Sequence, residues 1–320
     1  MRPQTGARNA AFSQSCLLCG AALRVQQAMS RILGLPFDRP QRVYECVHCG
    51  YRMLSPYFTE EEIRALYGDH YFTGETDARA HGATGFAVDY EVFAADRMPK
   101  FAATLDSILR HAPGARSILD VGAATGDFLN LARQRGLEPA GVELSAHAAT
   151  IAKDRHNLDL FVGRLEDFQT ARQFDAIHLN HVLEHFPDPK AIVRILARLL
   201  SRDGVIYVEV PFQFNIAERA KFQLTRSSAP FTISSIHHST FFTPSTLAAL
   251  FAPVQMRAVH LRVFDRSRYP ARTPLQRAKR LAWEMLSWLD QGVFIEAIFA
   301  FYEGKNDDKT NSHRTQNAVK

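Results

Sequence analysis

The stretch that decides the fold is Ser117-Ile-Leu-Asp-Val-Gly-Ala-Ala-Thr-Gly-Asp127, a short apolar run that leads through a turn into a helical pattern. Residues 118–121 have the length and composition of a buried strand. Gly122 and Gly126 allow the backbone to turn tightly after that strand. A strand, a turn and a helix in this order predict an α/β fold, with ligands bound beyond the carboxyl end of the strand.

The same alternation continues on the C-terminal side of this turn. Helices are expected over residues 127–135 and 146–156, with a strand at 140–143 between them. Further strands are expected at 159–162, 174–179, 205–210, 254–263 and 293–302. Apolar strands that alternate with helices predict a parallel sheet covered on both faces.

The charges of the turn favour a sulfonium cofactor over a dinucleotide. A dinucleotide-binding turn reads GxGxxG, but Ala124 and Asp127 stand at the second and third glycine positions. A carboxylate at the start of the helix would repel a pyrophosphate. S-adenosylmethionine has no phosphate, and its methionyl ammonium is attracted by a carboxylate such as Asp120. Glu143, at the end of the next strand, is placed to bind ribose hydroxyls.

The four cysteines of the chain predict a structural zinc ribbon within residues 1–55. They form two CxxCG pairs, Cys16 with Cys19 and Cys46 with Cys49. Two residues between the thiolates let one turn direct both sulfurs at a single ion, and the 26 residues between the pairs can form a hairpin or a loop. Two disulfides or redox-active pairs are the alternative, which a chain without an export signal makes less favourable.

Six motifs follow one another over residues 98–265, in the order and spacing of a known enzyme family. They are ILDVGAATGDF, AGVELS, VGRLEDF, FDAIHLNHVLEHFPDP, GVIYVEVP and HHSTFFTPSTL. Through them the chain resembles the class I S-adenosylmethionine-dependent methyltransferases. With its CxxCG pairs it further resembles zinc-ribbon methyltransferases of sugar and polysaccharide modification, although the longer C-terminal domain of the sugar C-methyltransferases is missing. Ala124 stands where the family usually has glycine, a change that is tolerated unless the backbone there has a positive φ.

The resemblance implies both a fold and a set of cofactor contacts. The fold is a Rossmann-like, doubly wound, mostly parallel seven-stranded sheet over residues 98–304, which strands 254–263 and 293–302 close as an antiparallel pair. The cofactor is S-adenosylmethionine. Asp120, Gly122 and Gly126 would line its methionyl end, Glu143 would hold its ribose, Leu165 and Glu166 would flank its adenine, and Asn180 and His181 would face its sulfonium. Ala124 and Leu144 are further candidates for cofactor contacts. At the adenine, Asp167 is almost as good a candidate as Glu166.

Three histidines are candidates for the base that accepts a proton during methyl transfer. A base of this kind accelerates transfer to a hydroxyl or a carbon acid by about 10²- to 10⁴-fold. His181 is the first candidate, and His185 and His238 are the others. The i, i+4 spacing of His181 and His185 also suits two metal ligands, but no third ligand is evident. A structural role remains open for His185 and His238, and His178, inside a strand, is expected in the core.

The formal charge of +5 is concentrated in one segment. Residues 257–280 contain eight basic side chains against Asp265 alone. This segment suits an anionic substrate, nucleic acid or a membrane surface, unless it is a solvated arginine-rich face. The leading hypothesis is methylation of a small anionic acceptor such as a nucleotide-linked or lipid-linked sugar. The alternatives are an RNA methyltransferase, which uses the ribbon and the basic segment to hold RNA, and a protein that binds without catalysing.

The remaining segments carry weaker expectations. No apolar run precedes Cys16, and acidic residues interrupt the apolar stretch at 281–302, so we expect neither a secretory signal nor a transmembrane helix, and a cytoplasmic location. Residues 56–97 are expected to form a connector or lid and 305–320 a disordered tail. Residues 266–291 are expected to be a helical insertion that packs on the sheet or rests on anionic lipid.

Overall fold

The computed structural model describes residues 15–29, 41–57, 94–215, 238–264 and 292–302, and the positions 59, 273–274, 277–278 and 281. Most of the expected connector, most of the helical insertion and the expected tail lie outside the described residues, as does part of the basic segment. Among the described residues, no helix combines the length and the hydropathy that a bilayer span requires.

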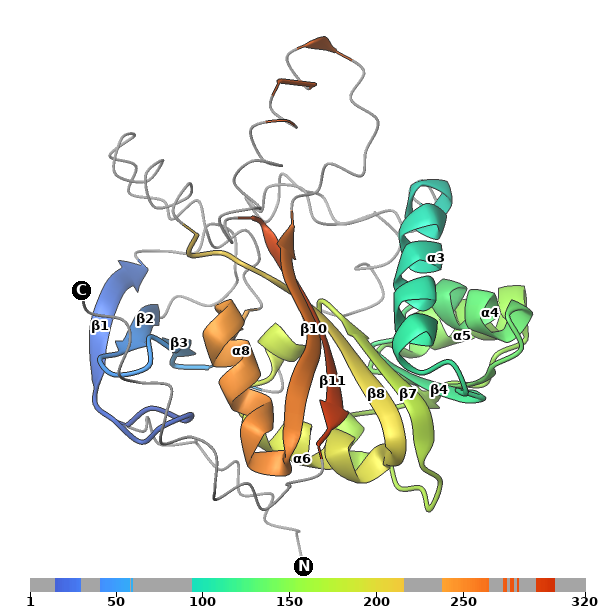
Figure 1. Ribbon diagram of the computed structural model, residues 1–320, viewed down its shortest axis with the longest axis horizontal. Helices are drawn as coiled ribbons and strands as arrows, with labels where there is room; N and C mark the ends of the chain where they lie inside the picture. The colour runs from blue at the N-terminus through green and yellow to red at the C-terminus, as the bar shows by residue number, and fades with distance from the viewer. Residues whose placement is uncertain are drawn as a thin grey trace, which may run out of the picture.

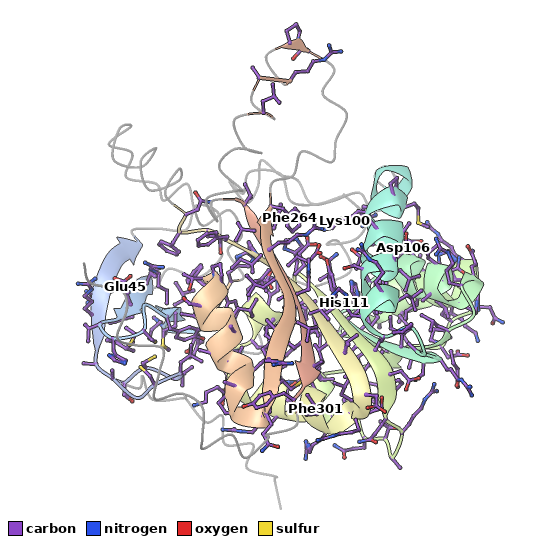
Figure 2. The ribbon with its side chains drawn as sticks, in the orientation of Figure 1. Glu45, Lys100, Asp106, His111, Phe264 and Phe301 are labelled. Atoms are coloured by element: carbon purple, nitrogen blue, oxygen red, sulfur yellow. The ribbon has the colours of Figure 1, made fainter. Side chains whose placement is uncertain are left out.

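A seven-stranded sheet forms the centre of the protein (Figure 1). In sheet order its strands are β10 (Met256–Phe264), β11 (Phe294–Phe301), β8 (Leu200–Pro211), β7 (Phe174–Asn180), β4 (Ser117–Val121), β5 (Glu138–Glu143) and β6 (Phe161–Val162). Strands β8 to β6 run parallel, whereas β11 is antiparallel to both β8 and β10. Phe264 and Phe301, the last residues of β10 and β11, accordingly lie at opposite ends of this pair (Figure 2). The predicted sheet and its antiparallel closing pair are confirmed.

Helices cover both faces of the sheet and separate two apolar cores. α3 (Ala94–His111), α4 (Asp127–Gln134) and α5 (Ala146–His156) contribute to one core, and α6 (Pro189–Leu199) and α8 (Pro244–Phe251) to the other. Strand side chains alternate between these cores: in β7, Ile177 belongs to the α6 and α8 core and Ala176 to the α3 and α4 core. Helices on both faces bury both sides of each strand, so the strands are apolar on both faces. This arrangement is the doubly wound, Rossmann-like architecture.

Side-chain caps fix where the helices begin. The Ser145 hydroxyl accepts a hydrogen bond from the Ala148 amide, so α5 begins at Ala146 as predicted. Asp188 caps α6 in the same way, and Thr243 and Thr246 form a reciprocal capping box at α8. Short 3-10 turns at η1 (Leu165–Asp167), η2 (Leu183–His185) and η3 (Ala252–Val254) complete the connections.

The cysteine pairs belong to a second, four-stranded sheet of order β1-β2-β3-β9. β1 (Leu23–Met29) and β2 (Gln41–Cys46) form the hairpin that was one of the two expectations for this segment, and β3 (Arg52–Ser55) pairs with β2. The fourth strand, β9 (Thr240–Phe241), comes from far along the chain, and the Leu54 amide donates to the Ser239 carbonyl at 2.9 Å. This small sheet lies on the α8 side of the molecule (Figure 1), where Tyr51 and Met53 join the α6 and α8 core.

The Asp175 carboxylate joins the starts of three central strands. Its Oδ2 accepts hydrogen bonds from the backbone amides of Arg116 and Ser117 and from the Ser117 hydroxyl, and its Oδ1 accepts one from Ser201. Burial alone would raise the pKa of this carboxyl, but the hydrogen bonds outweigh burial and lower it.

We therefore expect Asp175→Asn to lower the free energy of unfolding by about 1 kcal/mol near neutral pH. Because the folded pKa lies below the unfolded one, this stabilisation is present above pH about 4 and is lost as the pH falls through the folded value. Urea unfolding at pH 7 and at pH 3 should show the gap between variant and wild type shrinking in acid. Asp203→Asn, an exposed change in β8, is the control, and a gap independent of pH would contradict this role.

Candidate active site

The turn after β4 holds three residues in the left-handed region of backbone conformation. Gly122, Ala124 and Gly126 have φ values of 76°, 48° and 78°. A Cβ on Gly122 would lie 2.6 Å from Val182 Cγ2, so packing as well as conformation requires glycine there. Ala124, which departs from the family pattern, therefore occupies a position where glycine would be less strained, at a cost of about 1–2 kcal/mol. The condition under which the alanine would be tolerated, a backbone without positive φ, is not met.

Glu143, at the end of β5, connects this turn to the next loop. Its Oε2 accepts a hydrogen bond from the Ala124 amide and its Oε1 one from the Ser145 amide, both at 2.8 Å. The residue is 7% exposed, and burial outweighs the hydrogen bonds and raises the pKa of its carboxyl. The carboxylate predicted to bind ribose thus also holds together the two loops that border the sheet edge.

Asp120 lies beneath the turn and is paired with a buried histidine. Its Oδ1 is 2.7 Å from His178 Nδ1, and both residues are at most 3% exposed. The His178 ring stacks on Phe128 and Tyr207, with ring centroids 3.8 Å and 5.3 Å away. The expectation that His178 lies in the core is confirmed, and the structure adds that it fixes the orientation of Asp120.

Leu144 and the groups predicted to contact adenine lie in different environments. Leu144, just after β5, is 41% exposed, whereas Leu165 in η1 is 2% exposed and packs in the core. Glu166 receives a hydrogen bond from Arg164 on Oε1, but its buried Oε2 has no hydrogen-bond partner among the described residues. Asp167 is exposed. Glu166 thus keeps a buried oxygen without a partner among the described residues, whereas Asp167 faces solvent.

These residues fit S-adenosylmethionine in both place and chemistry. Asp120, Glu143 and Leu144 stand at or just beyond the carboxyl ends of neighbouring parallel strands, the edge where such sheets bind ligands. They offer buried carboxylates for hydroxyl and ammonium groups and an exposed leucine for an apolar ring. The orphaned oxygen of Glu166 adds an acceptor for the exocyclic amine of adenine.

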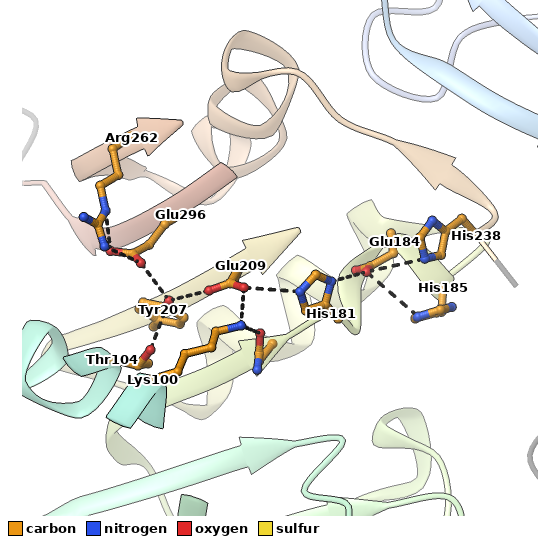
Figure 3. Close-up of polar contacts among 11 residues, drawn as sticks. Lys100, Thr104, His181, Glu184, His185, Tyr207, Glu209, His238, Arg262 and Glu296 are labelled. Carbon is orange, nitrogen blue, oxygen red and sulfur yellow. Dashed lines mark hydrogen bonds and ion pairs between the residues drawn. The ribbon is translucent and has the colours of Figure 1, made fainter. Parts of the chain in front are cut away.

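His181, the first residue after β7, is held between two buried carboxylates (Figure 3). Its Nδ1 lies 3.4 Å from Glu184 Oε1 and its Nε2 lies 3.2 Å from Glu209 Oε1. Burial alone would lower the pKa of His181, but the two carboxylates outweigh burial and raise it. The side chain remains 31% exposed, so it can meet a ligand.

Lys100 completes the surroundings of His181 and was not identified from the sequence. Its ammonium contacts Glu209 and donates to Asn180 Oδ1 at 3.4 Å. Glu209 is fully buried, and Lys100 and His181 together overcome the effect of burial and lower the pKa of its carboxyl. Nothing in the local sequence marks Lys100. Glu209 was not identified from the sequence either, although an acidic residue inside the apolar run 205–210 is a signal that could have found it.

The polar chain continues from Glu209 across the sheet to β10 (Figure 3). The Tyr207 hydroxyl lies 3.1 Å from both Glu209 Oε2 and Glu296 Oε2, and Arg262 forms a bidentate pair with Glu296. Glu296 on β11 is the cross-strand neighbour of Glu209 on β8. Arg262, one of the basic residues of 257–280, is therefore engaged with a buried carboxylate.

The other two candidate histidines meet His181 at a single carboxylate. His185 Nε2 and His238 Nε2 lie 3.9 Å and 3.8 Å from Glu184 Oε1, and the His185 and His238 rings are 4.9 Å apart. His238 Nδ1 is hydrogen-bonded to Gln213 Oε1 at 2.8 Å. The structure thus gathers all three candidate bases around Glu184 (Figure 3), although His238 is far from the other two in sequence.

The four cysteines converge at the tips of the small sheet. Their sulfurs lie within 4.8 Å of one another, with Cys16 to Cys49 at 3.6 Å and Cys19 to Cys46 at 3.5 Å. Gly20 and Gly50 have the positive φ expected after each pair. A tetrahedral zinc ion with Zn–S bonds of about 2.3 Å requires sulfurs roughly 3.8 Å apart, so the donor set fits zinc.

Comparison with known proteins indicates a methyltransferase domain. The family model described as "Methyltransferase domain" matches residues 90–261. A ubiquinone biosynthesis O-methyltransferase of Xanthomonas campestris is 30% identical over 157 residues, which cover 45% of this chain and 64% of the relative.

Two solved structures are similar over a shorter part of the chain. DesVI of Streptomyces venezuelae is 29% identical (38% of this chain, 55% of that one, TM-score 0.35). The sugar N-methyltransferase KedS8 of Streptoalloteichus is 30% identical (37% and 51%, TM-score 0.33). The family model spans more than half of the 320 residues, and the chain belongs to the family of methyltransferase domains.

Proposed function

We propose that the protein transfers the methyl group of S-adenosylmethionine to a hydroxyl of a small, anionic acceptor, such as a nucleotide-linked or lipid-linked sugar. The observation that carries this proposal is the position of His181 at the end of β7, partly exposed and between two buried carboxylates. The curated relatives named as O-methyltransferases support oxygen as the acceptor atom. The excess of basic residues in 257–280 supports an anionic acceptor.

We assign the cofactor contacts by the chemistry of each group. Glu143 would bind the ribose hydroxyls, Glu166 Oε2 would accept from the adenine amine, and Leu144 would cover the adenine ring. Asp120 supplies negative charge near the methionyl ammonium. Bound at this edge, the cofactor would supply an electrophilic methyl group next to His181, and no covalent bond to the protein is required.

His181 would act as the general base. Transfer forms the bond between the acceptor oxygen and the methyl carbon as the bond between sulfur and that carbon breaks. The hydroxyl proton passes to the ring nitrogen of neutral His181 that carries no proton, Nδ1 or Nε2. Glu184 and Glu209 stabilise the imidazolium that results, which makes His181 a stronger base than an isolated histidine. Lys100 and Asn180 lie beside this position and would orient the acceptor.

We further propose that the four cysteines bind a structural zinc ion and that the ribbon positions the active site. β3 pairs with β9, and the Ser239 amide, next to β9, donates to the Glu184 carbonyl at 2.8 Å. The ribbon therefore supports the two segments that carry Glu184 and His238. This role explains the ribbon without requiring that it bind RNA.

Replacing one cysteine tests the zinc site. Cys19→Ser should reduce the zinc content by one ion per chain and lower Tm by about 4 °C or more, because zinc binding contributes directly to folding. Metal analysis and thermal unfolding measure both effects. Arg24→Ala on the exposed face of β1 is the matched control and should retain the ion. An unchanged zinc content in Cys19→Ser would contradict the assignment.

Two further variants separate binding from catalysis. Glu143→Ala should weaken S-adenosylhomocysteine binding by about 100-fold, because the carboxylate that would accept two hydrogen bonds from the ribose hydroxyls is lost. His181→Asn should leave that affinity nearly unchanged and lower kcat by about 10²- to 10⁴-fold. Asparagine is chosen because it tolerates the left-handed backbone at position 181, where φ is 57°. Calorimetry and turnover measure the two effects.

The control for Glu143→Ala is Glu138→Ala, at the exposed start of the same strand. Binding that falls equally in Glu143→Ala and His181→Asn would show that the two residues do not have separate roles.

The acceptor class is tested with methyl-labelled S-adenosylmethionine and an extract of cells that lack the enzyme. Label in a small anionic or lipid-extractable fraction supports the proposal, because that fraction contains sugar nucleotides and lipid-linked sugars. Ribonuclease-sensitive label in macromolecules would replace it with the RNA methyltransferase hypothesis. Absence of label, with S-adenosylhomocysteine binding intact, would favour a protein that binds without catalysing.

A further inference from the structure

We propose that Glu184, His185 and His238 form a binding site for one divalent transition-metal ion, separate from the four cysteines. Their donor atoms, Glu184 Oε1 and the Nε2 atoms of both histidines, lie within 4.8 Å of one another. Glu184 and His185 come from η2, whereas His238 precedes β9. The three side chains converge from two segments (Figure 3).

The first argument is the state of the Glu184 carboxylate. The residue is 1% exposed, yet neither carboxylate oxygen has a hydrogen-bond partner among the described residues. A buried carboxylate without hydrogen bonds is costly and rare in native proteins. The His238 and His185 nitrogens, at 3.8 Å and 3.9 Å from Glu184 Oε1, are too distant to supply those bonds, and His181 Nδ1, at 3.4 Å, lies beyond the usual hydrogen-bond distance. A cation would supply the missing partner.

The second argument is the tautomer of His238. Gln213 Oε1 can only accept a hydrogen bond, so His238 Nδ1 must donate it. In the neutral ring Nε2 then presents a lone pair, and it is Nε2 that approaches Glu184 Oε1. Two acceptors that face each other repel unless a cation lies between them. A hydrogen bond from the far nitrogen to a carbonyl oxygen is also the usual arrangement for a metal-bound histidine.

The spacing is close to that of a loaded site. Bonds of about 2.1 Å in a tetrahedral or octahedral arrangement place neighbouring ligand atoms roughly 3.0–3.5 Å apart. Shifts of about half an ångström would bring His185 and His238 to that distance from Glu184 Oε1. The exposed fraction of the His185 side chain, 23%, leaves the cluster open on one side.

The structure therefore revises the metal alternative raised by the sequence. The i, i+4 pair of His181 and His185 is not the ligand set, because His181, although its Nδ1 lies 3.4 Å from Glu184 Oε1, is not in the group of donor atoms that all lie within 4.8 Å of one another. Glu184 and His238 are the partners of His185, and His238 could not be found from local spacing. Two imidazoles and one carboxylate suit zinc, manganese, iron or cobalt better than calcium or magnesium.

Three protein ligands leave coordination positions for another molecule. An acceptor hydroxyl bound there would lose its proton more easily and would lie beside His181. This catalytic role rests on the proposed function, whereas binding of the ion does not.

The test is a Mn²⁺ titration of the whole protein with its cysteine site already loaded with zinc, followed by electron paramagnetic resonance. Mn²⁺ prefers nitrogen and oxygen donors to thiolates, so it reports on this cluster rather than on the ribbon. We expect one Mn²⁺ per chain in the wild type. Glu184→Gln and His185→Ala should each raise the Kd for Mn²⁺ by at least about ten-fold.

The control variant is His111→Ala, which removes a histidine at the end of α3 that is not part of the cluster. It should bind Mn²⁺ like the wild type. S-adenosylhomocysteine binding checks that each variant is folded, and His185→Ala, at a partly exposed position, serves if Glu184→Gln does not fold. Failure of the wild type to bind Mn²⁺ at 1 mM, or equal Kd values in wild type and His185→Ala, would overturn the proposal. Either result leaves the labelling test of methyl transfer unaffected.

Discussion

The parallel hydrogen-bond ladder of β4, β7 and β8 is the constraint on which the rest of the structure depends. Because these strands run in the same direction, their carboxyl ends meet at one edge of the sheet. Asp120, His181 and Glu209 are brought to that edge from three separate parts of the chain. Asp175 fixes the opposite ends of the same strands, so the register that aligns the site is held at both ends.

Buried charge is the second feature that organises the site. Glu209 and Glu296 sit within strands that are otherwise apolar, and each is at most 1% exposed. Such carboxylates are tolerated only when paired, and Lys100, Tyr207 and Arg262 provide the pairing. Glu184 differs from them, because histidines surround it without completing its hydrogen bonds. Glu209 and Glu296 thus belong to a network of paired charges, whereas the Glu184 carboxylate lacks hydrogen-bond partners among the described residues and is the centre of the proposed metal site.

The ribbon and the larger sheet are physically linked rather than merely tethered. The ribbon sheet obtains its fourth strand from β9, and the same short segment carries His238. The sequence-based boundary at residue 55 separates two units along the chain, but the hydrogen bonds cross it. A structural metal in the ribbon and a second ion at Glu184 would thus lie on either side of one strand segment, with distinct tasks.

The sequence by itself determined the features that depend on residues close together in the chain. The glycine turn, the bounds of α5 and the two CxxCG knuckles follow from local turn chemistry, capping and periodicity, and all three occur as predicted. β8 begins at Leu200, earlier than expected, because Leu200 already pairs with Phe174 of β7, while the polar residues 201–203 hide this start in the sequence.

Only the tertiary structure decided which distant residues meet. Lys100 next to Glu209, His238 next to Glu184 and β9 next to β3 have no local signature, since each contact depends on how separate elements pack. The positive φ of Ala124 likewise follows from the path that the turn must take, and not from the residue itself. A few consecutive residues determine the local backbone conformation, whereas the fold as a whole determines which groups lie next to a buried charge.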